Sequence, residues 1–208
     1  MLMALLDGRA LTAGELARAA EVSPQSASAH LAKLVEGGLI LVHPQGRHRY
    51  YRMAGPEVSS VLETLGVIAT TRPPRSFVRT PHDAALCFAR TCYDHLAGTL
   101  AVDLAQRLES DQVLAPAGAG EREYSLGPQG DAWLQRFGVD LLPRRGVLGR
   151  RCMDWTERRP HIGGPLGVRL FDRFIDRGWL ARKDGTRALR VTDRGVRGFG
   201  ELGVSIRC

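Results

Sequence analysis

The hydrophobic positions at the start of the chain predict three short helices. Leu2, Leu5 and Leu6 have helical spacing, and Thr12–Glu15 has the spacing of a capping box that begins a second helix. Ser23 and Pro24 mark a third start, because a serine hydroxyl caps free N–H groups and proline is favoured at the first helical position. An apolar stripe then carries this helix to about Glu36, and two glycines end it. The stripe consists of Ala27, Leu31, Leu34 and Val35.

Two strands and another helix are predicted to follow. Residues 39–43 and 47–53 have strand character, and the turn Pro44-Gln45-Gly46 joins them. In the returning strand, Tyr50 and Tyr51 must face opposite sides, so one is expected in the core and the other on the surface. Pro56 begins the next helix. The order of helix, turn, helix and two-stranded wing predicts a winged helix-turn-helix domain over residues 1–70.

The next segment predicts a linker and a second domain. Residues 71–79 contain Pro73-Pro74, which cannot continue a helix, so we expect a linker there and a second domain over residues 80–208. From Thr80 to about Leu108, apolar residues recur at steps of three and four, which predicts one long helix. Its stripe consists of Ala85, Phe88, Cys92, Leu96, Leu100 and Leu104. A strand is expected over residues 121–126.

The last third of the chain repeats the pattern of the first. When residues 31–44 are set over 171–184, the apolar positions coincide and Gly38 meets Gly178. After a one-residue gap Gly46 meets Gly185, a strand follows to Val191, and a last helix begins at Thr192-Asp193. We therefore expect a second winged-helix-like unit in the C-terminal domain. The predicted fold class is mainly α (α+β).

The composition is that of a soluble globular protein. The chain has 208 residues, of which 44% are hydrophobic and 25% charged, so it can bury a core and wholesale disorder is excluded. No run approaches the roughly 18 apolar residues of a membrane span, and the opening MLMALLDGRA lacks the basic start of a secretory signal. Four cysteines without tight spacing do not form a disulfide framework. A cytoplasmic location with no membrane partner is expected.

The third helix and the wing carry side chains suited to DNA. A winged helix-turn-helix places the N-terminal end of its recognition helix in the major groove, where Gln25 can make a bidentate contact with adenine. Basic residues at the wing tip suit phosphate or minor-groove contacts. The expected partner is double-stranded operator DNA. The expected contact residues are Ser23, Gln25, Ser26, Ser28, His30 and Lys33 of the helix and Arg47, His48 and Arg49 of the wing.

These segments resemble the ArsR-type (ArsR/SmtB) family of dimeric bacterial repressors. The resemblance is carried by LTAGELARAAEVSPQSASAHLAKLVEGGLI and by RHRYYRM. It implies a homodimer that binds a pseudo-palindromic operator and is released by an effector. Two features depart from the family. Members normally have a further N-terminal helix that helps dimerisation, and the segments ELARAAEV and PEVSSVLETL lack the Cys or His of the family's metal sites. Any sensing must use other residues.

Two segments of the second domain concentrate unusual chemistry. The first contains Cys92, Asp94 and His95; the second runs from Cys152 to His161 and shares the order Cys-x-Asp. The pattern C-x-D-W-x-E-R-R-x-H before Gly163-Gly164 resembles a C-terminal domain attached to a subset of ArsR-type regulators. That resemblance implies no particular ligand. The candidate effector residues are Cys92, Asp94, His95, Cys152, Asp154, Trp155, Glu157, Arg158, Arg159 and His161.

Three kinds of effector are compatible with these residues. Thiolate and imidazole suit a thiophilic metal ion, Zn(II), Cd(II), Pb(II) or Cu(I), bound by Cys92, His95, Cys152 and His161. Cys92 and His95 would share one face of the predicted long helix. A thiol switch would need Cys92 close to Cys152, or a thiolate stabilised by a neighbouring arginine. An anionic or organic small molecule would use Arg158, Arg159 and His161, with Trp155 as an apolar wall.

Purely structural roles compete with all three effectors. A cysteine on an apolar stripe is usually a small core residue, which would explain Cys92. Asp154 and Glu157 would then form an ion-pair cluster with Arg158.

Two further classes of function remain as alternatives to a regulator. A cysteine-dependent enzyme would use Cys92 as nucleophile, with Asp94 and His95 or His161 activating it. No oxyanion loop, phosphate loop or metal-hydrolase pattern accompanies these residues, so we expect a regulator and not an enzyme. A winged helix used only for protein interaction is the other alternative. The second winged unit is not expected to read DNA sequence, because its segment 161–167 is rich in Gly and Pro.

The net charge favours a polyanionic partner without locating it. The formal charge is +7, but residues 1–72 contribute only +1, from 7 basic and 6 acidic residues. Residues 73–208 contribute +6, from 22 basic and 16 acidic residues. The support for DNA binding is therefore local: Arg47, Arg49 and Arg52 in the wing, and a recognition helix without acidic residues before Glu36.

Overall fold

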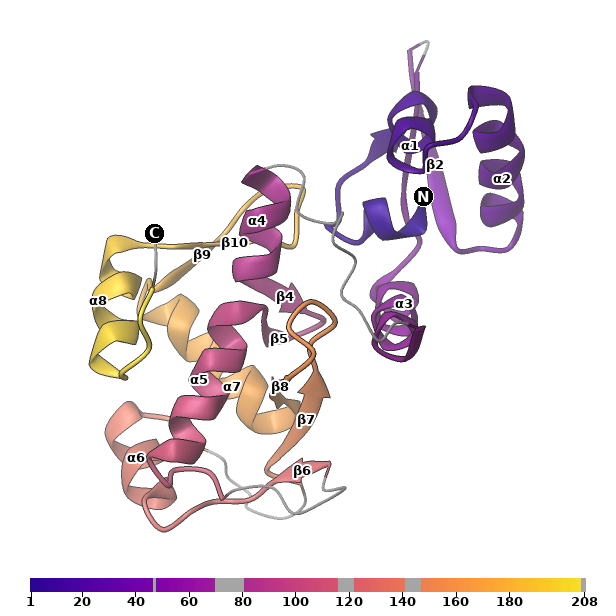
Figure 1. The fold of residues 1–208 in the computed structure, drawn as a ribbon. Helices are drawn as coiled ribbons and strands as arrows, with labels where there is room; N and C mark the ends of the chain where they lie inside the picture. Colours follow the sequence, from indigo (N-terminus) through magenta and orange to yellow (C-terminus); the bar gives the residue numbers. More distant parts are fainter. Residues whose placement is uncertain (47, 70–80, 116–121, 141–146, 207–208) are drawn as a thin grey trace. The chain divides into compact units, whose positions relative to one another are not determined.

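A computed structural model describes residues 1–46, 48–69, 81–115, 122–140 and 147–206, and it divides the chain into two units (Figure 1). Unit 1 consists of Met1–Gly66 and Asp184–Arg187, and unit 2 of Val67–Lys183 and Ala188–Cys208. The predicted linker at residues 71–79, Thr80 and the wing residue Arg47 lie outside the described residues. Within the described part, no helix is long and apolar enough to cross a membrane.

Unit 1 is a winged helix-turn-helix, as predicted. Its elements are the 3-10 helix η1 (Leu2–Leu5), β1 (Leu11–Thr12), α1 (Ala13–Ala19), α2 (Pro24–Glu36), β2 (Ile40–Gln45), β3 (His48–Met53) and α3 (Pro56–Ala69). The capping box is confirmed, because the Thr12 hydroxyl accepts from the Glu15 N–H and the Glu15 carboxylate accepts from the Thr12 N–H. Ser23 caps α2, and Gly38 has φ +68 just after the helix.

The core of unit 1 is small and lies between α1, α2 and the wing. The sheet has the strand order β1-β3-β2, and β2 pairs antiparallel with β3 from Ile40↔Met53 to Gln45↔His48. The short β1, which the sequence pattern did not predict, pairs Leu11 with Tyr51. Tyr51 is buried and Tyr50 is half-exposed, which confirms their opposite orientations. The buried core residues are Leu5, Leu16, Leu31, Ile40 and Tyr51.

Unit 2 combines helices with short β-hairpins, so the predicted α+β class is confirmed. Its elements are α4 (Pro81–Phe88), β4 (Arg90–Cys92), β5 (His95–Ala97), α5 (Thr99–Ser110), β6 (Glu123–Tyr124), α6 (Gly130–Phe137), β7 (Gly149–Met153), β8 (Pro160–Gly163), α7 (Gly164–Asp176), β9 (Leu180–Arg182), β10 (Leu189–Val191) and α8 (Asp193–Glu201). Strands β6, β7 and β8 form one sheet, and β4 pairs with β5.

The predicted second winged-helix-like unit is the segment from α7 to α8. Its helix–hairpin–helix order repeats that of α2, β2, β3 and α3. Gly178 has φ +66, like Gly38 at the aligned position, and Gly185 has φ +69, like Gly46. In both units the residue after the first glycine donates its N–H to the carbonyl oxygen five residues before it, Trp179 to Phe174 and Leu39 to Leu34. The repeated pattern therefore reflects the same helix ending and turn.

The predicted long helix from Thr80 to Leu108 is wrong. Residues 90–97 instead form the β4–β5 hairpin, in which Cys92 pairs directly with His95. The chain reverses at Tyr93, whose φ is +58, and Gly98 has φ +92 before α5 begins. The apolar spacing predicted one long helix because α4 and α5 each have an apolar stripe with helical spacing. The strand residues between them continue the same spacing by coincidence. Cys92 and His95 are therefore opposed across a hairpin.

Candidate functional site

The N-terminal end of α2 presents polar side chains to solvent. Gln25, Ser28, His30 and Lys33 are exposed, whereas Ala27 and Leu31 on the opposite face are buried. Ser23 and Ser28 also have local roles. The Ser23 hydroxyl accepts from the Ser26 N–H at 3.1 Å, and the Ser28 hydroxyl donates to the Pro24 carbonyl at 2.9 Å. Gln25 is thus the side chain of this turn best suited to reading a base.

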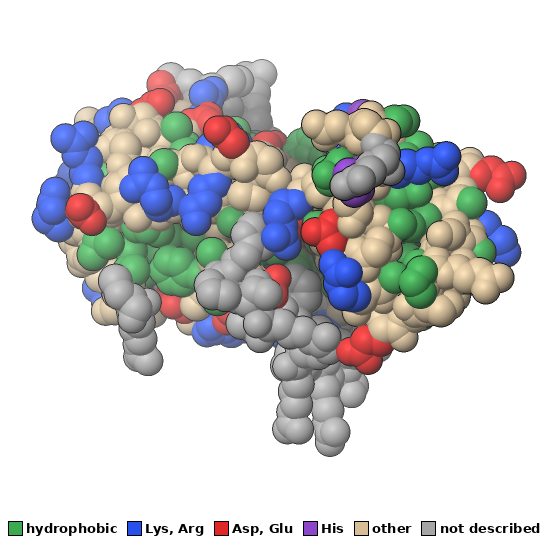
Figure 2. Space-filling model, turned by 90° about the horizontal axis from the view of Figure 1, so that it is seen from above, with side chains coloured by type: hydrophobic (Ala, Val, Ile, Leu, Met, Phe, Trp, Pro, Cys, Tyr) green, Lys and Arg blue, Asp and Glu red, His purple; other side chains and the backbone are tan. Residues whose placement is uncertain are grey.

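The wing carries the second set of predicted DNA contacts. His48 and Arg49 begin β3 and are exposed beside the turn, and Arg47 lies outside the described residues. Figure 2 shows that, on the face drawn, Lys and Arg side chains (blue) are interspersed with Asp and Glu side chains (red). The basic side chains therefore do not form one continuous surface on this face. The support for DNA binding comes from the individual side chains of α2 and the wing.

The structure brings together two Cys–His pairs from unit 2. Cys92 on β4 pairs with His95 on β5, and Cys152 on β7 pairs with His161 on β8. The four ligand atoms of these residues, two Sγ and two imidazole nitrogens, all lie within 4.8 Å of one another. We call these four residues the Cys/His cluster. Directly opposed residues of an antiparallel ladder have neighbouring side chains, so each hairpin delivers one thiol and one imidazole.

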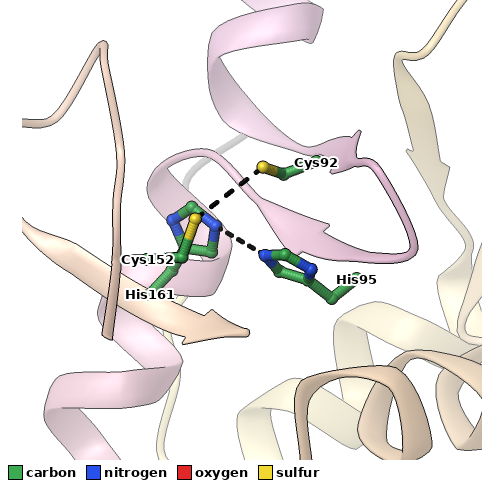
Figure 3. Close-up of side chains that lie close together, drawn as sticks. All are labelled: Cys92, His95, Cys152 and His161. Atoms are coloured by element: carbon green, nitrogen blue, oxygen red, sulfur yellow. Dashed lines mark hydrogen bonds between the residues drawn. The ribbon is translucent and has the colours of Figure 1, made fainter. Parts of the chain in front are cut away.

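The four side chains of the cluster lie close together, and dashed lines join Cys92 to Cys152 and His95 to His161 (Figure 3). The Sγ atoms of Cys92 and Cys152 are 3.9 Å apart, and the Nε2 atoms of His95 and His161 are 3.2 Å apart. His161 is 1% exposed and His95 7%, whereas the two cysteines are half-buried. The two cysteines lie 60 positions apart in the sequence and the two histidines 66, so only the tertiary fold joins them.

Each histidine of the cluster has a carboxylate beside its other ring nitrogen. Nδ1 of His95 lies 2.9 Å from Asp94 Oδ1, and Nδ1 of His161 lies 3.6 Å from Asp154 Oδ2. Both carboxylates come from the repeated order Cys-x-Asp noted in the sequence. The Asp94 carboxylate favours a proton on Nδ1 of His95, which leaves Nε2 of His95 as an acceptor facing the cluster, whereas the contact of His161 with Asp154 is too long for a hydrogen bond.

Asp154 joins the two hairpins of the cluster. It is fully buried, and both of its oxygens lie 2.9 Å from Nη2 of Arg90 on β4. Its Oδ2 accepts from the Gly98 N–H at 2.8 Å, and its Oδ1 accepts from the N–H and hydroxyl of Thr156. Sequence reasoning missed Arg90 and Gly98 as its partners, although an arginine within an apolar stretch was an available signal.

The surroundings shift the pKa values of three groups at the site. Hydrogen bonding to Cys152 and burial raise the pKa of the Cys92 thiol to about 12, against the opposing effect of the two histidines. Burial alone would lower the pKa of His95, but contacts with Cys92 and Asp94 outweigh it and raise that pKa. Burial would raise the pKa of Asp154, but Arg90, Thr156, His161 and Gly98 hold it well below its usual value. Asp154 is therefore a carboxylate in the folded protein.

Two glycines allow close backbone approaches at the site: Gly98 against the end of α4, and Gly163 against His95 of the β4–β5 hairpin. At Gly98, with φ +92, a Cβ atom would lie 2.5 Å from the Cys87 carbonyl oxygen. At Gly163, at the end of β8, a Cβ atom would lie 3.1 Å from Nε2 of His95 and 3.3 Å from Cβ of Cys152. The second contact shows how closely the backbone of β8 packs against the Cys/His cluster.

The other candidate effector residues lie in different surroundings. Trp155 is buried, with the Arg90 guanidinium 5.1 Å from its ring centre. Glu157 accepts from the Thr99 hydroxyl at 2.7 Å, and Arg159 reaches Gln106 and Glu157. Arg158 has φ +58 and donates its N–H to the Asp154 carbonyl. The contacts of these residues fix the segment that connects β7 to β8.

The fold and its exposed recognition helix define a winged helix-turn-helix protein of the DNA-binding class, and comparisons with known proteins agree. Residues 1–43 match the family described as "Helix-turn-helix domain". The HTH-type transcriptional regulator YdfF of Bacillus subtilis (strain 168) is 39% identical over 202 residues, which cover 96% of this chain and 88% of YdfF. The chain therefore belongs to the HTH-type transcriptional regulators, and the similarity extends through both units.

One solved structure is similar in the DNA-binding domain. It is the homodimeric winged helix-turn-helix domain (fragment 1–100) of Mb0332 from Mycobacterium bovis, described as a possible ArsR-family transcriptional regulator. It is 31% identical, the match covers 33% of this chain and 63% of that fragment, and the TM-score is 0.30. The prediction of a helix-turn-helix transcriptional regulator is confirmed.

Proposed function

We propose that this regulator is a homodimeric, cytoplasmic repressor that releases its operator when a thiophilic metal ion binds the Cys/His cluster of unit 2. The observation that supports this most strongly is the convergence of two thiols and two imidazoles within 4.8 Å. Soft sulfur and imidazole donors together suit Zn(II)-class ions and not Mg(II) or Ca(II). Repression is the simplest mode of action, because a dimer bound at a promoter occludes it.

In this proposal DNA is bound by α2 and the wing of unit 1. Gln25 and its neighbours at the start of α2 would enter the major groove, and His48 and Arg49 would contact the flanking backbone. The second winged unit would not read sequence. Its helix α7 begins with Gly164-Pro165, and Leu166 and Gly167 of its first turn are buried, so few polar side chains are available there.

Gln25→Ala is expected to relax base preference, with a loss of about 1–3 kcal/mol at one base pair of the operator. Arg49→Ala is the matched contrast. It is expected to weaken binding to every sequence and to reduce the salt dependence by about one phosphate contact. Fluorescence anisotropy on the promoter sequence and its single-base variants, at several salt concentrations, measures both effects. Unchanged operator affinity in both variants would contradict the assignment of the recognition helix and wing.

A second copy of the chain is the proposed partner of α3. Val61 and Leu65 are four residues apart on this helix and are 59% and 54% exposed, so they form an apolar stripe on one helix face. Such a stripe is costly in water and is covered when two copies pack together. A twofold dimer would also place two recognition helices on a pseudo-palindromic operator.

The geometry favours a metal ion over the other two effectors. A redox-sensing thiol normally has a lowered pKa, whereas the pKa of Cys92 is raised. A small-molecule pocket built on Trp155 and Arg159 finds little support, because Trp155 is buried against Arg90 and Arg159 is bonded to residues of α5 and to Glu157. The name of YdfF likewise supports a regulator over a cysteine-dependent enzyme.

Operator release by metal tests the proposal. Zn(II) or Cd(II) is expected to release the reduced wild-type protein from a fluorescent promoter fragment, because metal binding favours a conformation with lower DNA affinity. The double variant Cys92→Ser/Cys152→Ser should remain bound, and Cys87→Ser, which lies outside the cluster, should behave like the wild type. Release by hydrogen peroxide alone would instead identify a thiol switch, since the two Sγ atoms are 3.9 Å apart. If neither the metal ion nor hydrogen peroxide releases the protein from the promoter fragment, sensing at this cluster is contradicted.

A further inference from the structure

We infer that the Cys/His cluster is a closed, four-coordinate site for one Zn(II) or Cd(II) ion per chain. The ligand atoms are Sγ of Cys92 and Cys152 and Nε2 of His95 and His161. The inference deepens the proposed function, on which it rests for its regulatory meaning, by naming the class of ion, the coordination and the donor atoms. Three features of the cluster carry it.

The first feature is the spacing of like donor atoms. Zn–N bonds of about 2.0–2.1 Å and Zn–S bonds of about 2.3 Å in a tetrahedron give edges of about 3.3 Å between nitrogens and about 3.8 Å between sulfurs. The Nε2 atoms are 3.2 Å apart and the Sγ atoms 3.9 Å apart. The mixed edges need to close to about 3.6 Å, and since all four atoms already lie within 4.8 Å, a contraction of about 1 Å is enough.

The second feature is the direct approach of two imidazole nitrogens. With Asp94 at Nδ1 of His95, this ring favours the tautomer that leaves Nε2 without a proton, whereas the buried Nδ1 of His161 lies 3.6 Å from Asp154 and has no hydrogen-bond partner among the described residues. The two Nε2 atoms face each other at 3.2 Å, so one proton or one metal ion lies between them. A metal ion bound to both Nε2 atoms leaves the proton of His161 on Nδ1, the nitrogen that faces Asp154.

The third feature is the repeated supply of outer carboxylates. Each hairpin contributes a cysteine, an aspartate two residues later and a histidine whose Nδ1 faces that aspartate. Metal-bound histidines usually donate their second nitrogen to such a carboxylate, which fixes the ring and increases its basicity. Asp154 is in turn fixed by Arg90 and Gly98, so the carboxylate that lies 3.6 Å from Nδ1 of His161 belongs to a buried network. Asp94 is 49% exposed and holds His95 from the solvent side.

Four protein ligands leave no open position on the ion. Catalytic zinc sites keep a position for water or substrate, whereas closed Cys2His2 sites stabilise a conformation. The burial of both histidines and the close approach of Gly163 to His95 fit the closed type. The inferred site would therefore lock the β4–β5 hairpin to the β7–β8 hairpin, and it would not catalyse a reaction.

Titration of the reduced, metal-free, full-length protein with Co(II) in the absence of DNA tests this inference. Tetrahedral cobalt has strong visible absorption, and thiolate ligands add charge-transfer absorption in the near ultraviolet. Both signals are expected to saturate at one ion per chain and to be displaced by Zn(II) or Cd(II). Cys92→Ser and Cys152→Ser should each lose about half of the charge-transfer intensity, because each removes one of two sulfur ligands. Cys87→Ser is the matched control and should titrate like the wild type.

The exposed carboxylate gives a variant that leaves the buried core intact. Asp94→Asn is expected to weaken metal affinity by about 10- to 100-fold while the cobalt spectrum stays tetrahedral, because it acts only through the His95 ring. Weak octahedral absorption, a stoichiometry other than one per chain, or unchanged charge transfer in Cys92→Ser would overturn the inference. If the protein binds one ion with the expected spectrum but stays bound to its operator, the coordination stands and the proposed sensing is wrong. If metal releases the operator without this spectrum, the sensing stands and the inferred coordination is wrong.

Discussion

Asp154→Ala is expected to lower the free energy of unfolding of unit 2 by about 3–5 kcal/mol, because it leaves the guanidinium of Arg90 buried without its counter-charge. Arg90 is 1% exposed, and Asp154 also accepts from the Gly98 N–H, so the change removes the link between the two hairpins. Urea denaturation followed by tryptophan fluorescence measures the loss. All three tryptophans, Trp133, Trp155 and Trp179, lie in unit 2, so the signal reports that unit alone.

Two further variants distinguish the contribution of the buried ion pair from a general loss of stability caused by substitution. Asp94→Ala removes an aspartate at the corresponding position of the other hairpin, but this residue is 49% exposed and should cost under about 1 kcal/mol. Arg90→Met combined with Asp154→Leu replaces both charges by apolar groups and should recover much of the stability lost in Asp154→Ala. A loss below about 1 kcal/mol in Asp154→Ala would show that the pair does not hold the hairpins together.

Leu31→Ala is expected to lower the free energy of unfolding of unit 1 by about 2–5 kcal/mol and to abolish most operator binding. Leu31 is fully buried and belongs to the small buried cluster of unit 1 that the structure describes. A domain of this size rarely has more than about 3–5 kcal/mol of stability, so the recognition helix would lose its support. Thermal unfolding followed by far-ultraviolet circular dichroism, together with anisotropy on promoter DNA, measures both consequences.

Leu41→Ala is the matched control for this prediction. Leu41 lies on β2 of the same domain and is 39% exposed, so the same truncation should change stability by under about 0.5 kcal/mol and leave operator binding intact. Operator affinity of Leu31→Ala equal to that of the wild type would mean that α2 does not depend on this core, and would count against its role as the recognition helix.

Most of unit 1 could be predicted from the sequence because its elements depend on local interactions. The Thr12–Glu15 capping box, the Ser23–Pro24 helix start and the glycine at residue 38 act within a few residues, and all three were confirmed. The same local rules identified the second winged unit through Gly178 and Gly185. Short strands such as β1 escaped prediction, because two residues carry no period and depend on pairing with Tyr50 and Tyr51.

The candidate site shows where such rules end. The residue types of the Cys/His cluster, and the repeated order Cys-x-Asp, were visible in the sequence, and the four residues predicted as metal ligands are those that the structure brings together. The spatial arrangement of these residues was not visible in the sequence. The helical spacing from Phe88 to Leu100 gives no indication that the chain reverses at Tyr93. The carboxylate that fixes the hairpins is paired with an arginine 64 residues away, and no local pattern specifies that contact.

The sequence by itself therefore determined the class of protein, the recognition helix and the wing, since capping, helix endings and alternation are short-range effects. Only the tertiary structure decided that Cys92, His95, Cys152 and His161 share one site. Two hairpins had to be packed against each other, and that packing depends on the buried contact between Arg90 and Asp154 and on glycines that let the backbones approach.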